Sequence, residues 1–404
     1  MTSGVLFIES YTAGGADQIA KILLQELPFT HLTILINRNS NKKIILSKSL
    51  PKNVKVEYYN LITLPDLFER SQKISNKYLL LTAKICIHSF RYFLFLYSIF
   101  YFFIRLKRLN ACIFFANNGG YPGGDCCRSA SIASSFIART RTFHIIHSMA
   151  HTAPKLIHYV ERIIDFIIDK RCQVITICDA AAKQLKRVRN FKQNPIVIYN
   201  GIDQDSFSSK LSNNTIKAAS DSVVRIINVG YFDYNKNQTM LIEAAGELSR
   251  RGYINFEVHF LGEETSEGLK KKCEQHVLES GLSDIIKFEG FVSNVIEWYE
   301  VSDIFVLCSN IEGFPVSVME AMASGLPVVV TDTGGVSELV NDGVDGYIIS
   351  RNNKEKLVDC LDSLVGNSHL RKKFGANGEK KISEHFTLHL MINRYAECFG
   401  LKRK

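Results

Sequence analysis

The sequence predicts an α/β protein built from two doubly wound domains. Apolar runs of strand length alternate with helical patterns, from "GVLFIE" and "HLTILIN" to "PIVIYN" in the first half and from "SVVRIINVG" to "PVVVTDTGG" in the second. Continuous apolar strands between helices are typical of parallel sheets that are covered on both faces. The length of 404 residues exceeds what one hydrophobic core usually reaches, so two cores are expected.

A polar stretch separates the two sets of strands. It follows "YNGID" and reads "QDSFSSKLSNNTIKAASDS", a composition typical of a linker. We expect a first domain over residues 1–203, a second over 204–385, and a C-terminal helix within 386–404 that packs back on the first. Because doubly wound sheets bind ligands beyond the carboxyl ends of their strands, we expect the two domains to face each other across a cleft.

Charge is distributed unevenly between the halves. Residues 1–200 hold 27 Lys and Arg against 11 Asp and Glu, whereas residues 201–404 hold 22 against 29. An anionic partner is therefore expected at the first half. The ten cysteines lack metal-ligand spacing, and the start of the chain lacks the basic, long apolar pattern of a signal peptide. These features favour reduced thiols in a cytoplasmic protein.

One segment of the first half is unusually aromatic. Between Arg91 and Arg105 in "SFRYFLFLYSIFYFFIRLKRLN", all thirteen residues except Ser98 are apolar or aromatic. Thirteen residues are too few to span a bilayer as a helix. The segment is either a core helix or a helix that lies in a membrane interface, and its eight aromatic residues between basic flanks favour the interface.

Glycines follow several of the predicted strands. Gly14 and Gly15 lie between the first strand and the first helix, and Gly230 precedes Lys236 at the matching turn of the second half. Backbone amides at such turns hold phosphate groups, and a nearby lysine suits a diphosphate. The alternatives are an ordinary turn and a solvated lysine. A third strand ends at Gly262, where the backbone of another group can approach closely.

The stretch "EGFPVSVMEAMASGLP" predicts a buried helix from about Pro315 to Ser324, with proline at its start and Gly325 at its exit. Apolar residues cover almost every face of this helix, so the carboxylates of Glu312 and Glu320 need partners. Those partners lie either inside the protein core or on a bound ligand. Hydroxyl groups of a sugar and a ribose would satisfy them, and the helix N-terminus would attract an anion.

Together with "VGYFDYNKNQTMLIEA", "FLGEE", "FEGFVSNVIEWYEVSDIFVLCSNI", "PVVVTDTGGVSELVNDGVDGYII" and "AGGADQIA", this stretch resembles the family 4 glycosyltransferases, retaining enzymes of the GT-B fold. The resemblance implies metal-independent and cofactor-free transfer of a hexose or N-acetylhexosamine from a nucleotide sugar, expected to be UDP-linked, to a lipid-linked saccharide of bacterial O-antigen or capsule. It further implies a cytoplasmic, peripheral protein that contacts an anionic membrane surface, here through residues 89–110, and no nucleic acid.

The resemblance assigns roles to individual positions. Glu312 corresponds to a glutamate that contacts the donor sugar, Lys236 to a lysine that neutralises the leaving diphosphate, and His147 to a histidine that faces the sugar. Glu320 corresponds to the glutamate that holds the ribose, and Val292 to a backbone contact of the base. The implied donor-binding residues are Gly14, Gly15, Tyr231, Gly262, Val292, Gly313, Phe314, Pro315, Val316 and Glu320.

Two features depart from this interpretation. Tyr231 stands where the family usually has arginine, so the alternative function is a non-catalytic nucleotide-sugar-binding partner subunit with the same fold. Asp203 and Asp205 form an Asp-x-Asp pattern that elsewhere binds metal, but they lie in the linker region and no metal is expected there. The loop "NNGGYPGGDCC" is either an acceptor contact or a flexible loop.

Overall fold

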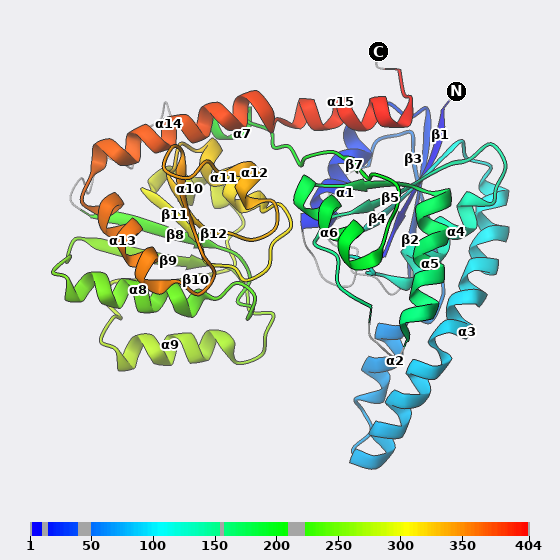
Figure 1. Cartoon of the computed structure of the whole chain (residues 1–404), viewed down its shortest axis with the longest axis horizontal. Helices are drawn as coiled ribbons and strands as arrows, with labels where there is room; N and C mark the ends of the chain where they lie inside the picture. The colour runs from blue at the N-terminus through cyan, green and yellow to red at the C-terminus, as the bar shows by residue number, and fades with distance from the viewer. Residues whose placement is uncertain (1, 10–14, 39–49, 154–156, 209–222, 403–404) are drawn as a thin grey trace. The chain divides into compact units, whose positions relative to one another are not determined.

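The computed structural model describes residues 2–9, 15–38, 50–153, 157–208 and 223–402. The chain divides into two compact units (Figure 1). Unit 1 comprises Met1–Ile198 and Ile392–Lys404, and unit 2 comprises Tyr199–Met391. Each unit contains its own parallel sheet between helices, so both have the doubly wound architecture that the alternating pattern predicts.

Unit 1 has a seven-stranded parallel sheet in the order β3-β2-β1-β4-β5-β6-β7. Its strands are β1 (Ser3–Ile8), β2 (His31–Asn37), β3 (Val54–Tyr59), β4 (Ile113–Asn118), β5 (Arg141–Ile146), β6 (Gln173–Thr176) and β7 (Ile196–Val197). Its helices are α1 (Gly15–Glu26), α2 (Leu64–Ser71), α3 (Lys77–Leu109), α4 (Asp125–Ser135), α5 (His158–Arg171) and α6 (Asp179–Arg189). The central strands β1 and β4 are buried along nearly their whole length because helices cover both faces.

Helix α3 is longer than the aromatic segment that marks it in the sequence. It runs for 33 residues, and the side chain of Asn76 caps its start by accepting hydrogen bonds from the amides of Tyr78 and Leu79. Phe102 and Leu106 are buried in the core of unit 1, whereas Phe93 and Phe100 are more than 60% exposed. One side of the helix is thus a core element and another faces outward. Among the described residues, α3 is also the one helix whose length and composition would allow it to cross a membrane.

A buried ionic network joins helices α3 to α6. Glu161 on α5 accepts hydrogen bonds from Arg128 on α4 and Arg189 on α6, and Arg91 on α3 pairs with Asp125 at the start of α4. The guanidinium groups lower the pKa of Glu161 to about 2, so its carboxylate stays ionised at neutral pH. Removing one partner would leave an uncompensated buried charge, which is strongly destabilising.

The last helix, α15 (Leu388–Phe399), belongs to both units, because unit 1 resumes at Ile392. Its final residue, Phe399, packs in unit 1 with ring centroids 4.5 Å from Phe143 and 5.0 Å from Phe115. Arg141 donates hydrogen bonds to the carbonyl oxygens of Cys398 and Phe399. The end of the chain therefore completes the aromatic core of unit 1.

Unit 2 has a six-stranded parallel sheet in the order β10-β9-β8-β11-β12-β13. Its strands are β8 (Val224–Val229), β9 (Phe256–Leu261), β10 (Ile286–Gly290), β11 (Ile304–Leu307), β12 (Val328–Thr331) and β13 (Gly346–Ile349). Its helices are α7 (Asp205–Ser208), α8 (Gln238–Arg250), α9 (Leu269–Glu279), α10 (Val295–Val301), α11 (Val316–Ala323), α12 (Val336–Leu339), α13 (Lys354–Val365) and α14 (Ser368–His385). A large apolar core packs between this sheet and helices α8, α9 and α13.

Both sheets reverse their strand order at one point. In unit 1 the reversal lies between β1 and β4, and in unit 2 it lies between β8 and β11. The connections that leave two such neighbouring strands go to opposite sides of the sheet and open a crevice at the carboxyl ends. The candidate residues are therefore best sought after β1 and β4 in unit 1 and after β8 and β11 in unit 2.

Candidate functional site

In unit 2, the turn after β8 positions Lys236. Asp233 organises this turn, because its side chain accepts a hydrogen bond from the amide of Asn235 at 2.8 Å and its carbonyl accepts one from the amide of Lys236 at 2.8 Å. Asn237 then adopts a left-handed conformation, with φ of 50°, and begins α8. The short polar turn thus fixes the lysine just before the helix, as the sequence pattern predicts.

Glu312 lies on the loop after β11 and meets Lys236. Its Oε1 is 2.6 Å from the Lys236 Nζ, and the glutamate side chain is 10% exposed. The amide of Asn310 donates to the carbonyl of Asn235 at 2.6 Å, which ties the two loops together. The amide of Glu312 donates to the Thr333 hydroxyl at 3.2 Å. A cation and an anion are therefore held side by side at the strand-order reversal of this sheet.

The backbone of Gly334 packs directly against the loop that carries Glu312. Its φ is +58°, and a Cβ at this position would lie 2.1 Å from the carbonyl oxygen of Glu312. The amide of Gly335 donates to the Gly313 carbonyl at 2.7 Å. The pair in "TDTGG" thus sets the position of the Glu312 backbone, a role that its sequence spacing alone does not reveal.

We expect Gly334→Ala to lower the free energy of unfolding by about 1–3 kcal/mol, because alanine resists positive φ and its methyl group meets backbone that cannot move aside. Chemical denaturation measures this change. Gly343→Ala is the matched control, since Gly343 also has positive φ (72°) but open space around its Cβ direction. Equal losses for the two variants would contradict a packing role at Gly334.

Helix α11 starts beside Glu312. Pro315 is its N-cap residue, and no side chain caps the helix. Proline has no N–H group, so Pro315 gives no donor to an anion, in contrast to the amides that we expected around it. The ring of Phe314 is buried against Tyr199 and Phe386, with centroids 5.3 and 5.4 Å away. Only the backbone of Phe314 is left for ligand contact, and Val316 contributes the first helical amide.

Glu320 lies further along α11 and has a partner inside unit 2. The Tyr299 hydroxyl on α10 donates a hydrogen bond to its Oε2 at 3.1 Å. Burial raises the pKa of Glu320 to about 7, although the Tyr299 hydrogen bond opposes this change. At neutral pH the carboxyl group therefore exchanges readily between its neutral and ionised forms.

Three further candidate residues follow the neighbouring strands β8, β9 and β10. Gly262 has a φ of +149°, and a Cβ there would lie 2.1 Å from the Gly230 carbonyl, so its close approach is to the protein backbone. Tyr231 is 37% exposed, and its carbonyl accepts a hydrogen bond from Gln238 at 2.8 Å. Val292 is half-buried in the loop between β10 and α10.

In unit 1, the candidate residues gather around Asn117 at the end of β4. The His147 Nε2 lies 2.7 Å from the Asn117 Oδ1, and the Asn117 Nδ2 donates to the carbonyl of Ala16 at 3.0 Å. The Asn117 Oδ1 can only accept a hydrogen bond, so the proton of the His147 ring is on Nε2. The other ring nitrogen, Nδ1, is therefore an acceptor; it is buried and has no partner among the described residues. Burial lowers the pKa of His147 to about 4, so the ring is neutral at pH 7.

Asn117 thus links His147 to the start of α1, where Gly15 is the first helical residue. Sequence reasoning placed Asn117 only within a glycine-rich loop. Asn117 bridges two residues that are distant in sequence, because His147 is 30 residues away and Ala16 is 101 residues away. Gly14, the other glycine of that turn, lies outside the described residues.

Two other titratable residues, His144 and Asp203, have structural roles. His144 is buried between Ser131 and Asn118, and burial lowers its pKa to about 3. Asp203 accepts a hydrogen bond from the Ser206 hydroxyl at 2.8 Å beside the short helix α7. Within the described ranges, no three His, Cys, Asp or Glu residues are grouped as a metal would require.

Residues 213–381 match the family model "Glycosyl transferases group 1". Among curated proteins, the chain is 35% identical over 121 residues to the lipopolysaccharide core biosynthesis mannosyltransferase LpsB of Rhizobium meliloti, covering 30% of this chain and 34% of that protein. It is 30% identical over 174 residues to the putative glycosyltransferase EpsD of Bacillus subtilis, covering 42% and 44%. The chain therefore spans about a third to a half of the length of these relatives.

Solved structures share the fold over nearly the whole chain. HepE of Anabaena in complex with UDP is 18% identical, with a TM-score of 0.75 and coverage of 99% of this chain and 100% of that one. The lipopolysaccharide outer core galactosyltransferase WaaB is 15% identical, with a TM-score of 0.66 and coverage of 99% of both. The chain thus has the GT-B fold, and its residues 213–381 carry the sequence pattern of the group 1 glycosyl transferases.

Proposed function

We propose that this protein is a retaining glycosyltransferase that moves a hexose or N-acetylhexosamine from a nucleotide sugar, UDP-linked, to a lipid-linked saccharide of a bacterial surface polysaccharide. The observation that carries the proposal is the 2.6 Å contact between Lys236 and Glu312 at the strand-order reversal of unit 2. It lies within the segment that matches the group 1 family. Support for the donor comes from similarity to HepE, which was solved with UDP and with UDP-glucose.

The proposed chemistry needs a cation where the diphosphate departs. The bond between the anomeric carbon and the diphosphate oxygen breaks, while a bond to the acceptor hydroxyl oxygen forms on the same face. The acceptor proton passes to the departing diphosphate. Lys236 and the first amides of α11 stabilise the negative charge that develops, and Glu312 accepts hydrogen bonds from sugar hydroxyls. Glu320 does the same for the ribose. No metal or cofactor is needed for this step.

Mass spectrometry tests the function directly. The purified protein is incubated with a mixture of UDP- and GDP-sugars and lipid-linked acceptors from its host, with and without EDTA. We expect one glycosylated product, formed equally in EDTA, and its loss in Glu312→Ala. If no nucleotide sugar is bound or consumed, and Glu312→Ala behaves like the parent protein, the proposal is wrong.

Tyr231 favours a second candidate function, a non-catalytic subunit that binds a nucleotide sugar. A tyrosine hydroxyl donates a hydrogen bond but brings no positive charge to a diphosphate. Calorimetry with UDP-sugars, followed by a donor-hydrolysis assay, separates the two candidates. Binding without any hydrolysis or transfer would support the subunit, whereas activity that rises in Tyr231→Arg would support an enzyme with a weakened donor site.

We further propose that unit 1 lies on the anionic cytoplasmic face of the membrane through α3. Phe93, Leu96 and Phe100 are each more than 60% exposed, and the helix carries basic residues near both ends. Apolar side chains next to lysines and arginines suit an anionic lipid interface. Helix α5 adds Tyr159, Ile163 and Phe166, which are also more than 60% exposed. A hydrogen bond of 3.2 Å from the Tyr92 hydroxyl to Glu161 joins the two helices.

We expect the triple variant Phe93→Ser, Leu96→Ser, Phe100→Ser to leave the membrane fraction, because it removes apolar area that faces outward. Flotation with vesicles containing phosphatidylglycerol measures the bound fraction. The matched control changes Ile254 and Leu278, which are exposed apolar residues of unit 2, to serine. Binding that is unchanged in the α3 variant, or equally reduced in the control, would contradict the proposed contact.

A further inference from the structure

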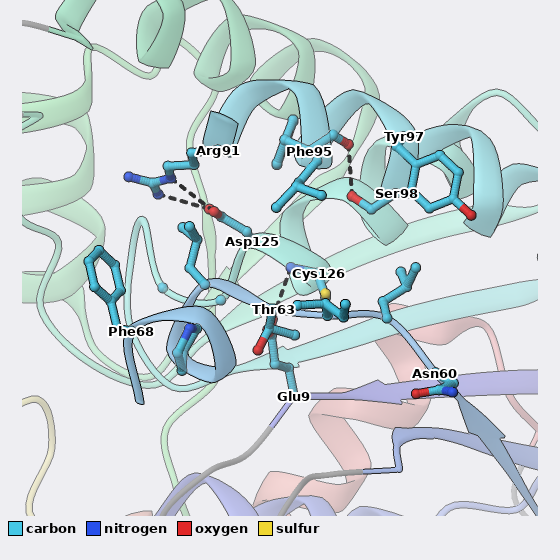
Figure 2. Close-up of a pocket in the computed structure, with 17 residues that line it drawn as sticks. Glu9, Asn60, Thr63, Phe68, Arg91, Phe95, Tyr97, Ser98, Asp125 and Cys126 are labelled. Atoms are coloured by element: carbon cyan, nitrogen blue, oxygen red, sulfur yellow. Dashed lines mark hydrogen bonds and ion pairs between the residues drawn. The ribbon is translucent and has the colours of Figure 1, made fainter. Parts of the chain in front are cut away.

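Unit 1 contains a cavity of about 620 Å³ beside α3. Figure 2 shows that its walls come from the loop after β3, from α2, from α3 and from the turn that precedes α4. Leu61, Leu64, Phe68, Leu94 and Phe95 give it a largely apolar lining. A concave apolar site of this size is large enough for a substantial ligand.

The polar groups on the cavity wall satisfy one another. Arg91 donates two hydrogen bonds of 2.9 Å to the carboxylate of Asp125 (Figure 2). The Glu9 carboxylate accepts hydrogen bonds from the amides of Cys126 and Cys127 at 2.9 and 3.2 Å, at the start of α4. Because the Arg91 charge is paired within the wall and the Glu9 carboxylate is a hydrogen-bonded acceptor, the interior favours an apolar ligand over an anionic one.

One end of the cavity reaches the exposed apolar side of α3. Tyr97 and Ile62 line the cavity and are each 52% exposed, while Ser98 and Leu61 further in are buried. Tyr97 lies four residues after Phe93 and three before Phe100, so it shares the face of α3 that carries these outward-facing side chains. The mouth of the cavity therefore opens within the surface that we propose to contact lipid.

The other end lies at the strand-order reversal of unit 1. Glu9 follows β1, and Gly124 precedes α4 and donates its amide to the Asn118 Oδ1 at 3.2 Å. Asn118 is the neighbour of Asn117, which holds His147. The cavity thus connects an outward apolar surface with the end of the sheet where the candidate residues of unit 1 are gathered.

We propose that this cavity binds part of the hydrocarbon chain of the acceptor lipid through its apolar lining. This inference rests on the proposed function, because it identifies how that acceptor is recognised. The apolar lining binds the chain, the mouth on α3 admits it from the membrane, and the position at β1 and β4 directs the attached group toward the candidate residues.

Photo-crosslinking tests the proposal with the full-length protein. The probe is a C20 isoprenoid monophosphate that carries a diazirine at the chain terminus, and labelled peptides are mapped by mass spectrometry. We expect labelling of cavity-lining residues such as Leu61, Phe68, Leu94 and Phe95, with competition by unlabelled isoprenoid phosphate and little by phosphatidylglycerol. Labelling confined to outward residues such as Phe93 and Phe100, or equal competition by phosphatidylglycerol, would overturn it.

Two serines of α3 provide a matched pair of variants. Ser98 lines the cavity and bonds the carbonyl of Phe95 at 2.7 Å, whereas Ser89 is exposed and bonds that of Ile85 at 3.0 Å. Ser98→Phe fills the cavity and should reduce cavity labelling at least tenfold, while Ser89→Phe should leave it unchanged. Leu94→Phe is a second filling variant in case Ser98→Phe folds poorly, which circular dichroism reports. Undiminished labelling in a folded filling variant would overturn the inference.

The outcomes separate this inference from the proposed function. If the cavity is labelled but no nucleotide sugar is turned over, the lipid site is supported and the proposed enzyme function is wrong. If a folded filling variant transfers sugar to a long-chain acceptor with unchanged kcat/KM, the enzyme function is supported. The proposal that the cavity binds the lipid chain is then wrong.

Discussion

Replacing Lys236 by methionine is expected to lower the rate of sugar transfer by roughly 10²–10³-fold, the usual cost of removing one group that stabilises developing negative charge. Methionine keeps the length of the apolar stem but removes the ammonium group that meets Glu312. Because the proposed role is to stabilise the departing diphosphate, the loss should fall mainly on kcat. Steady-state kinetics with the donor found by mass spectrometry measure it.

A substitution of Glu312 in the Lys236–Glu312 pair is expected to affect donor binding and transfer rate differently. Glu312 accepts a hydrogen bond from the Lys236 ammonium group at 2.6 Å, so a diphosphate that binds this lysine competes with the glutamate. Glu312→Gln removes that competition. We expect this variant to bind UDP as tightly as the parent protein or a few-fold more tightly, although its transfer rate falls about 100-fold because charged contacts to the sugar are lost.

An exposed ion pair in the same unit supplies the control for both variants. Lys354 on α13 lies 3.1 Å from Glu243 on α8, and both side chains are nearly half exposed. Lys354→Met should leave kcat within a factor of two, since an exposed pair contributes little. A Lys236→Met variant that retains near-normal kcat would show that this lysine is not the group that stabilises the leaving diphosphate.

Glu320→Gln is expected to stabilise unit 2 at alkaline pH and to weaken UDP binding. Burial raises the pKa of Glu320 from its ordinary 4.5 to about 7. Between these values the folded protein binds more protons than the unfolded chain, so the free energy of unfolding falls as pH rises through this range. At about 1.4 kcal/mol per pH unit, the total loss once Glu320 is fully ionised is at most about 3.5 kcal/mol. Glutamine cannot ionise and avoids it.

Denaturation between pH 4.5 and 8 measures this effect. The parent protein should lose stability across the window, whereas Glu320→Gln should lose less and become the more stable form above pH 7. Glu279→Gln, at an exposed position on α9, is the control and should follow the parent protein. Parallel curves for Glu320→Gln and the parent protein would contradict a raised pKa.

The same substitution should reduce UDP affinity about tenfold or more at pH 8, because a carboxylate accepts hydrogen bonds from ribose hydroxyls more strongly than an amide does. Calorimetry at pH 6 and pH 8 measures it. For the parent protein we expect tighter binding at pH 8, where Glu320 is ionised. If UDP affinity is independent of pH and is unchanged in Glu320→Gln, Glu320 does not bind the ribose.

Patterns that repeat along a strand or helix were predictable from sequence. The apolar runs gave both sheets, and the proline and glycine around α11 gave its ends within one residue. Local periodicity decides such features because neighbouring residues share one environment. For the same reason the glutamates stood out, since Glu312 just before α11 and Glu320 within it interrupt an otherwise apolar segment.

Contacts between distant residues were not predictable in the same way. The partners of Glu312 and Glu320 are Lys236 and Tyr299, which lie 76 and 21 residues away in sequence. Asn117 and Gly334 have roles that depend on which strands are neighbours. The start of α3 had a local signal that the aromatic pattern obscured, because Asn76 is a good N-cap residue followed by helix-forming residues.

The position of Phe399 has a consequence for biosynthesis. The chain leaves unit 1 after Ile198 and returns to it at Ile392, so a ribosome that has made every strand of the first sheet has not yet made the aromatic ring that packs with Phe115 and Phe143. Domains usually fold as units while the chain emerges. The aromatic core of unit 1 is therefore completed only after unit 2 has been translated.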